Sequence, residues 1–204
     1  MRIYLVRHGE TDWNLEMRIQ GQTDVPLNAV GIGQAEQCAL FFNDNHYDYL
    51  YSSALQRAKK TAQIIASPNQ TIKVYPELNE RSFGLWETCL WDDIHRNNPD
   101  LEQQWRRNGK YFQPPQGESI QEMTTRVTKK IQEIVSDHLL SDNLLVVTHG
   151  GPLKVIVGNM MGVDGYITYN SLAMHNCCIN IADYDGNSFK MERINYVHRP
   201  TTDC

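Results

Sequence analysis

The sequence lacks the marks of a membrane-bound, secreted or zinc-stabilised chain. Among its 204 residues no apolar run is long enough for a membrane span or a signal-peptide core, and residues 3–6 are followed at once by Arg7 and His8. The five cysteines show no CxxC spacing, so neither a zinc knuckle nor a thioredoxin-like pair is indicated. We therefore expect a cytoplasmic protein with reduced thiols.

An excess of basic charge is also missing. The chain has 19 Lys and Arg against 24 Asp and Glu, a formal net charge of -5. This balance argues against nucleic acid or an anionic membrane as partners, although it leaves room for a small basic pocket that binds an anionic substrate. Internal repeats, low-complexity tracts and linkers are absent, so the length predicts a single domain over residues 1–204. The sequence leaves a homodimer open.

The chain alternates short apolar runs with helical patterns. Strands are predicted over residues 2–7, 48–52, 71–75, 144–148, 176–184 and 188–195, and helices over 29–43, 54–67, 118–140 and 152–161. Residues 12–28 predict an irregular loop, and 78–116 predict a loop with short helices. The alternation predicts an α/β fold, a three-layer sandwich whose mostly parallel central sheet has helices on both faces. The most apolar run, 144–148, is expected at the sheet centre.

Polar residues of a few kinds follow the predicted strands, at the sheet edge where sites form in open α/β sheets. Arg7 and His8 follow the first strand, and Arg57 lies just after the second. His149 follows the most apolar strand, and Glu80 comes a short connection after the 71–75 strand. Two guanidiniums, two imidazoles and a carboxylate therefore meet at one edge, a set suited to a phosphoryl group.

Each of these groups has a part in phosphoryl transfer. Guanidinium groups bind phosphate oxygens with paired, charge-assisted hydrogen bonds. A neutral imidazole is a competent nucleophile near pH 7, and a covalent intermediate divides one difficult step into two. Fixed cations and helix-terminal amides stabilise the charge of the transition state. A carboxylic acid can protonate the leaving oxygen and afterwards accept a proton from water.

The segment 5–14, Leu-Val-Arg-His-Gly-Glu-Thr-Asp-Trp-Asn, resembles the signature of the histidine phosphatase superfamily, which includes the cofactor-dependent phosphoglycerate mutases. The resemblance continues in the family's order through residues 18–27, 51–58, 78–84, 117–119 and 147–151. A lone Arg-His-Gly would be weak support, but this ordered set is specific.

The resemblance implies a phosphohistidine intermediate on His8, with Glu80 as the proton donor. It also implies a clamp on the phosphoryl group formed by Arg7, Arg57 and His149. Further contacts to the phosphate or the substrate are implied for Asn14, Gln20, Gly21 and the Gly150 amide. Neither a metal ion nor an organic cofactor is expected for this mechanism.

Two departures from the family pattern favour a phosphatase over a mutase. Phe83 stands where mutases typically carry tyrosine, and the counterpart of their substrate-gripping lysine lies near Trp91. The chain is also shorter than mutases usually are. We predict a hydrolase of small phosphorylated metabolites, with two alternatives: a phosphoglycerate mutase, or a catalytically inactive phospho-ligand-binding relative. The substrate stays open among sugar phosphates, phosphoglycerate, α-ribazole phosphate and a broad range.

Several nearby residues have competing interpretations. A basic cluster could grip a second anionic group, but a solvated helix face is favoured for Arg106, Arg107 and Lys110. A packing role is favoured over a pocket lining for the tryptophans at 86, 91 and 105. Ordinary solvated carboxylates are the simplest interpretation of Glu77, Glu87 and Glu118. The pair Glu87-Thr88 also departs from the Glu-Gly usual in small phosphatases, which leaves the turn there open.

Overall fold

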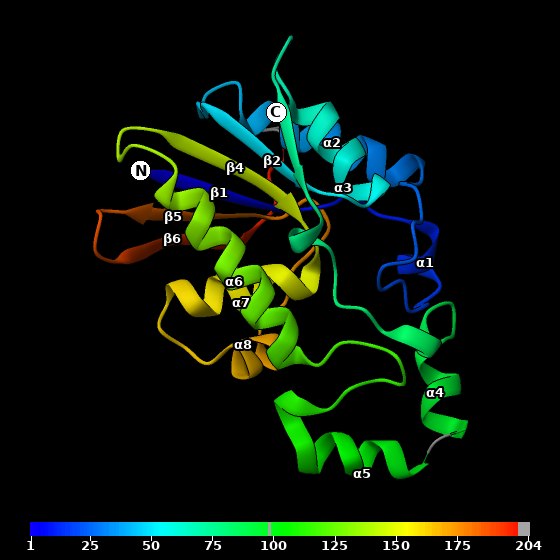
Figure 1. Ribbon diagram of the computed structural model, residues 1–204. Coiled ribbons are helices and arrows are strands. Elements are labelled where there is room, and N and C mark those ends of the chain that lie inside the picture. The colour runs from blue at the N-terminus through cyan, green and yellow to red at the C-terminus, as the bar shows by residue number, and fades with distance from the viewer. Residues whose placement is uncertain (98, 200–204) are drawn as a thin grey trace.

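The computed structural model describes residues 1–97 and 99–199, with the backbone alone at 99, 102, 105 and 106. The side chains of Trp105 and Arg106 therefore lie outside the described residues. A six-stranded sheet has the order β3-β2-β4-β1-β5-β6 (Figure 1). Its strands are β1 (Arg2–Arg7), β2 (Tyr49–Ser53), β3 (Ile72–Tyr75), β4 (Asn143–Thr148), β5 (Ile179–Tyr184) and β6 (Phe189–Tyr196). The first four are parallel, β5 is antiparallel to β1, and β6 is antiparallel to β5.

Helices cover both faces of this sheet, which confirms the predicted three-layer α/β fold (Figure 1). On one face lie α2 (Ala29–Phe41) and α3 (Gln56–Ile65). On the other lie α6 (Ile120–Ser136) and α7 (Gly150–Met160). In β1 the alternate residues Ile3 and Leu5 join the core under α6 and α7, whereas Tyr4 and Val6 join the core under α2 and α3.

The central strands are apolar because both of their faces are covered. Leu144 to Val147 are all buried, and β4 lies between β2 and β1, so the prediction that 144–148 lies at the sheet centre is confirmed. The antiparallel pair β5–β6 turns at residues 185–188, where the Asp185 carboxylate accepts hydrogen bonds from the amides of Asn187 and Ser188. This turn ends the sheet in an antiparallel edge.

Two short helices were not predicted. The loop predicted over 12–28 contains α1 (Asp12–Leu15), which Thr11 begins with a capping box. A second helix, α8 (Gly165–Ser171), is capped by the Asp164 side chain. The prediction of an irregular 12–28 segment is therefore wrong at its start, because local capping satisfies the amides of a single helical turn.

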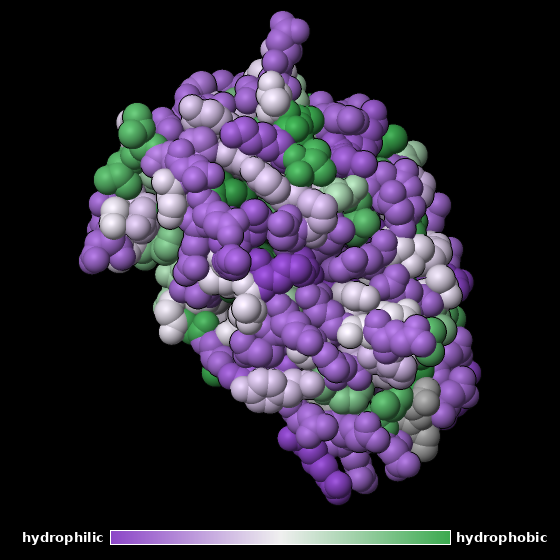
Figure 2. Space-filling view, viewed as in Figure 1, coloured by the Kyte–Doolittle hydropathy of each residue, from purple (hydrophilic) through white to green (hydrophobic). Residues whose placement is uncertain are grey.

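The middle section consists of short helices, as predicted. They are η1 (Pro76–Leu78), η2 (Gly84–Trp86), α4 (Trp91–Asn97), α5 (Pro99–Asn108) and η3 (Gly109–Tyr111). Trp86 lies buried with Phe83 and Phe112 in a separate hydrophobic cluster, and Trp91 packs against it, so the packing interpretation of these two tryptophans is confirmed. Figure 2 shows a mostly hydrophilic face with scattered apolar patches, and no helix in the described part of the chain is long and apolar enough to span a membrane.

Candidate active site

His8 and His149 leave neighbouring strands at the same edge of the sheet. Arg7 pairs with Thr148 in the β1–β4 ladder, and the His8 amide donates to the Thr148 carbonyl at 2.9 Å. The two imidazole rings lie 5.0 Å apart between centroids at 60°, and both are almost fully buried. His8 Nδ1 lies 2.6 Å from the Gly9 carbonyl oxygen. Because that oxygen can only accept, we assign the proton to Nδ1, which leaves a lone pair on Nε2.

Arg57 joins His149 from the first turn of α3. Its Nε donates to His149 Nδ1 at 3.2 Å, and its two terminal nitrogens donate to the carbonyls of Thr23 at 2.9 Å and Gly21 at 2.7 Å. The other ring nitrogen of His149 lies 2.6 Å from Ser53 Oγ. The guanidinium and the imidazole therefore form one fixed unit, since both ring nitrogens have partners.

Arg7 closes the other side of the site. One terminal nitrogen donates to the Met174 carbonyl at 2.6 Å, while its buried Nε has no hydrogen-bond partner among the described residues. A Cβ atom on Gly150 would lie 3.5 Å from that Nε, so the start of α7 lies against the guanidinium. The Gly150 N–H belongs to the first helical turn, whose amides have no partner within the helix. An unpaired buried donor beside a helix N-terminus is suited to an anion.

Glu80 lies beside these cations. Its Oε1 accepts from the Arg81 amide at 2.9 Å, and its Oε2 accepts from the Gly151 amide at 3.2 Å. Burial lowers the pKa of Arg57 to about 10, and the nearby Glu80 carboxylate opposes that shift. The structure thus brings together all five groups that the sequence singled out, namely Arg7, His8, Arg57, Glu80 and His149.

The same burial keeps the two histidines neutral. Desolvation, followed by the charges of Arg57 and Arg7, lowers the pKa of His8 well below its usual value of 6.5. Desolvation and Arg57 lower the pKa of His149 in the same way. At neutral pH, an entering anion therefore meets cationic guanidiniums and uncharged imidazoles.

Asn14 and Gly21, two of the remaining predicted contacts, have hydrogen-bond partners within the protein. The Asn14 side chain completes the α1 capping box, and Asn176 Nδ2 donates to the His8 carbonyl at 3.1 Å and to Asn14 Oδ1 at 3.4 Å. Gln20 is buried, and its Oε1 has no partner within the described residues. Gly21 holds Arg57 through its carbonyl. Contacts of these residues with a ligand stay a prediction.

The family model of the histidine phosphatase superfamily (branch 1) matches residues 3–197. The chain belongs to this superfamily. It is 38% identical over 189 residues to the probable phosphoglycerate mutase GpmB of Escherichia fergusonii, covering 90% of the chain and 85% of the relative. Alpha-ribazole phosphatase from Shigella flexneri has a TM-score of 0.88 at 28% identity, with 96% of each chain covered. A variant of phosphoserine phosphatase from Entamoeba histolytica, in complex with phosphoserine, has a TM-score of 0.84 at 26% identity, covering 96% of this chain and 97% of that one.

Sequence reasoning missed two carboxylates of this histidine phosphatase superfamily member. Glu118 was interpreted as a solvated side chain, but it is mostly buried in an ion pair with Arg126 at 2.8 Å. Glu87 was interpreted as a solvated side chain, but its oxygens accept from the amides of Gln22 at 3.0 Å, Thr23 at 2.8 Å and Phe83 at 3.0 Å, and from the Thr23 hydroxyl at 2.6 Å. It thereby fixes the loop whose carbonyls hold Arg57. The turn persists without glycine because Thr88 adopts a left-handed φ of 75°.

The basic cluster near α5 is partly engaged within the superfamily fold. Lys110 Nζ forms an ion pair with Asp164 Oδ2 at 3.1 Å, at the start of α8, and Arg107 is exposed. Arg107 agrees with the favoured solvated interpretation, whereas Lys110 is half-buried against Asp164. Within residues 1–97 and 99–199, no group of three His, Cys, Asp or Glu side chains could hold a metal ion.

Proposed function

We propose that the protein hydrolyses phosphomonoesters of small metabolites through a phosphohistidine on His8, without a metal ion. One observation carries the proposal: the buried His8 ring keeps a free Nε2 lone pair beside two guanidiniums and within 5.0 Å of His149. A neutral nucleophile among fixed cations is suited to a phosphate dianion.

In the first step His8 Nε2 attacks phosphorus and the bond to the ester oxygen breaks. Protonated Glu80 gives its proton to the departing alkoxide, which leaves as an alcohol. Arg7, Arg57 and the amide at the start of α7 stabilise the charge on the equatorial oxygens. His8 carries a formal positive charge while phosphorylated, and its Nδ1–H donates to the Gly9 carbonyl.

In the second step a water molecule attacks the phosphorus of phosphohistidine. The Glu80 carboxylate accepts the proton of this water, and the bond between phosphorus and Nε2 breaks. Inorganic phosphate leaves, His8 returns to its neutral form, and Glu80 is again protonated for the next substrate.

Packing at two positions supports a phosphatase over a mutase. Phe83 stands where mutases are expected to carry a tyrosine, and the counterpart of their lysine lies near Trp91. The rings of Phe83 and Trp91 pack together in the hydrophobic cluster, with their centroids 5.5 Å apart. The phosphatases of Shigella flexneri and Entamoeba histolytica, at 28% and 26% identity, cover nearly the whole chain and support the same choice.

The test is a panel of phosphorylated metabolites, including sugar phosphates, 3-phosphoglycerate and α-ribazole phosphate, ranked by kcat/KM in the presence of EDTA. We expect release of inorganic phosphate, an acid-labile phosphoenzyme, and neither product with His8→Ala. 3-Phosphoglycerate with a bisphosphoglycerate primer should give no 2-phosphoglycerate; its formation would establish the mutase instead. Inertness towards p-nitrophenyl phosphate from pH 5 to 8 would favour the inactive binder.

A further inference from the structure

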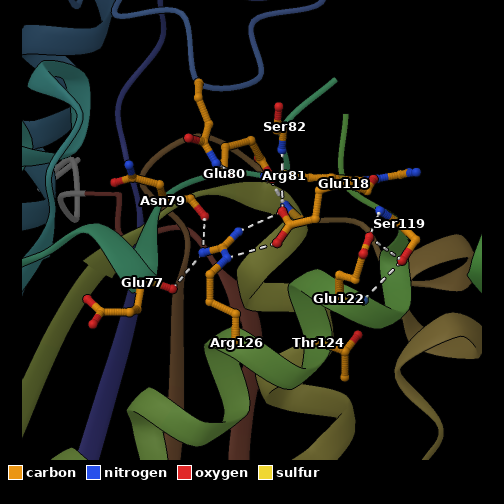
Figure 3. A network of polar contacts seen from close by, with 12 residues as sticks. Glu77, Asn79, Glu80, Arg81, Ser82, Glu118, Ser119, Glu122, Thr124 and Arg126 are labelled. Atoms are coloured by element: carbon orange, nitrogen blue, oxygen red, sulfur yellow. Dashed lines mark hydrogen bonds and ion pairs between the residues drawn. The ribbon is translucent and has the colours of Figure 1, made fainter. Parts of the chain in front are cut away.

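Arg126 on α6 makes four hydrogen bonds, two to the Glu118 carboxylate and two to carbonyls of the segment before Glu80 (Figure 3). Its Nε and one terminal nitrogen bind the two carboxylate oxygens of Glu118 at 2.9 and 2.8 Å. The other terminal nitrogen donates to the carbonyls of Glu77 at 2.6 Å and Asn79 at 3.2 Å. Arg126 therefore fixes the main chain directly before Glu80.

Glu118 fixes the main chain directly after Glu80. Its amide donates to the Ser82 carbonyl at 2.8 Å, and its Oε2 accepts from the Ser82 amide at 3.4 Å. Its own carbonyl accepts from Arg81 Nε at 2.7 Å. Residues on both sides of Glu80 are thus bonded to one ion pair.

No hydrogen bond joins the Glu80 carboxylate to either member of this pair; its oxygens accept from the amides of Arg81 and Gly151. We infer that the Arg126–Glu118 pair is a positioning device that aims Glu80 at the leaving oxygen. The inference rests on the proposed function and concerns its proton-transfer steps. A proton donor must be held within hydrogen-bond reach of its target, and a displacement of about 1 Å can cost on the order of 100-fold in rate.

The helix that carries Arg126 does not need this pair to form. Ser119 and Glu122 close a capping box at its start, and Met123 and Val127 bury its apolar face in the core. A partly buried ion pair is a weak source of stability because both charges lose water. The planar fork explains why arginine occurs here, since a lysine cannot bind a carboxylate in parallel and two carbonyls at once.

The test uses Arg126→Lys and Glu118→Gln with a series of esters running from p-nitrophenyl phosphate to alkyl phosphates. A nitrophenolate leaves without a proton, whereas an alkoxide needs one. We expect kcat/KM, which covers the steps up to loss of the leaving group, to fall about tenfold or more on alkyl phosphates and to change less than about twofold on p-nitrophenyl phosphate. Inhibition by inorganic phosphate should stay the same. Equal losses on both ester types would overturn the inference.

The matched control is Arg2→Lys. Arg2 also binds a carboxylate in parallel, through Asp183 at 2.9 and 3.1 Å, but at the opposite end of β1. Any loss of kcat/KM in this variant relative to the wild type should be the same for alkyl phosphates and for p-nitrophenyl phosphate. In a Glu80→Gln background, Arg126→Lys should cause no further loss of kcat/KM on alkyl phosphates, because the carboxyl group that the pair positions is already absent. An additive loss would also overturn the inference. Failure of the proposed function would appear separately, as wild-type protein that hydrolyses none of the esters.

Discussion

A Cβ atom on Gly151 would lie only 2.2 Å from Oε1 of Glu80. The start of α7 therefore touches the carboxylate directly, and the site has no room for a methyl group there. Gly151→Ala should displace Glu80 and lower kcat on alkyl phosphates by about 10-fold or more. The control is Gly33→Ala, because a Cβ at Gly33 in α2 meets no atom within 4 Å. Unchanged alkyl phosphate turnover in Gly151→Ala would contradict this contact.

Glu87→Gln should weaken phosphate binding and should affect alkyl and aryl phosphates to the same extent. An amide nitrogen cannot accept the N–H bonds that the carboxylate accepts from Gln22, Thr23 and Phe83. We expect the inhibition constant of inorganic phosphate to rise roughly tenfold, since a charge-assisted hydrogen bond contributes about 1.5–3 kcal/mol. Glu133→Gln on the exposed side of α6 is the control. A loss confined to alkyl phosphates would contradict the assigned role.

Thr88→Gly should stabilise the fold. Thr88 has a φ of 75°, a left-handed conformation that strains a β-branched residue. Glycine removes that strain at some entropic cost, and we expect a gain of about 1 kcal/mol, or roughly 2–4 °C in Tm. Differential scanning calorimetry measures the change, and kcat should stay the same. A lower Tm would show that the Thr88 side chain stabilises the fold by more than its left-handed backbone destabilises it.

The neutral histidines should make the fold sensitive to acid. Folding lowers the pKa values of His8 and His149 well below the unfolded value of about 6.5. The free energy of unfolding is therefore unaffected by these groups above about pH 6.5. It decreases as pH falls below that value, because the unfolded chain binds protons there while the folded histidines stay neutral. Each contributes a slope approaching about 1.4 kcal/mol per pH unit below that value. Urea unfolding at pH 7.5, 6.5 and 5.5 measures it, and a His8→Gln, His149→Gln variant should flatten the curve. An identical slope in that variant would assign the loss to other groups.

Lys154 should select substrates that carry a second anionic group. It lies one turn beyond Gly150 on α7, half-buried, and its Nζ donates to the Tyr169 carbonyl at 3.1 Å. No carboxylate of the described residues lies within 4 Å of it, and burial lowers its pKa. Lys154→Met should lower kcat/KM for 3-phosphoglycerate about tenfold and leave glycerol 3-phosphate unchanged. Equal effects on both esters would show that Lys154 only caps the end of α8 and does not bind the substrate.

The close approach of the site residues could be predicted from the sequence because these residues follow parallel strands. Once β1, β2 and β4 are neighbours, His8, Arg57 and His149 must meet at one edge of the sheet. The patterns that reveal these strands are local, continuous apolar runs, which is why the fold followed from them.

The supporting contacts could not be predicted, for two physical reasons. Glu87 and Glu118 take their partners from main-chain amides and a distant arginine, and a single sequence does not record which loops approach a carboxylate. The helices α1 and α8 are too short for periodicity to reveal, since segments of this length are not stable alone and depend on capping and tertiary contacts.

Arg57 is anchored through the carbonyls of Gly21 and Thr23. A main-chain oxygen is present whatever side chain occupies the position, so a substitution at Thr23 removes its hydroxyl bond to Glu87 but not the acceptor for Arg57. The outer loop can therefore take a different side chain at this position while the guanidinium beneath it keeps its orientation.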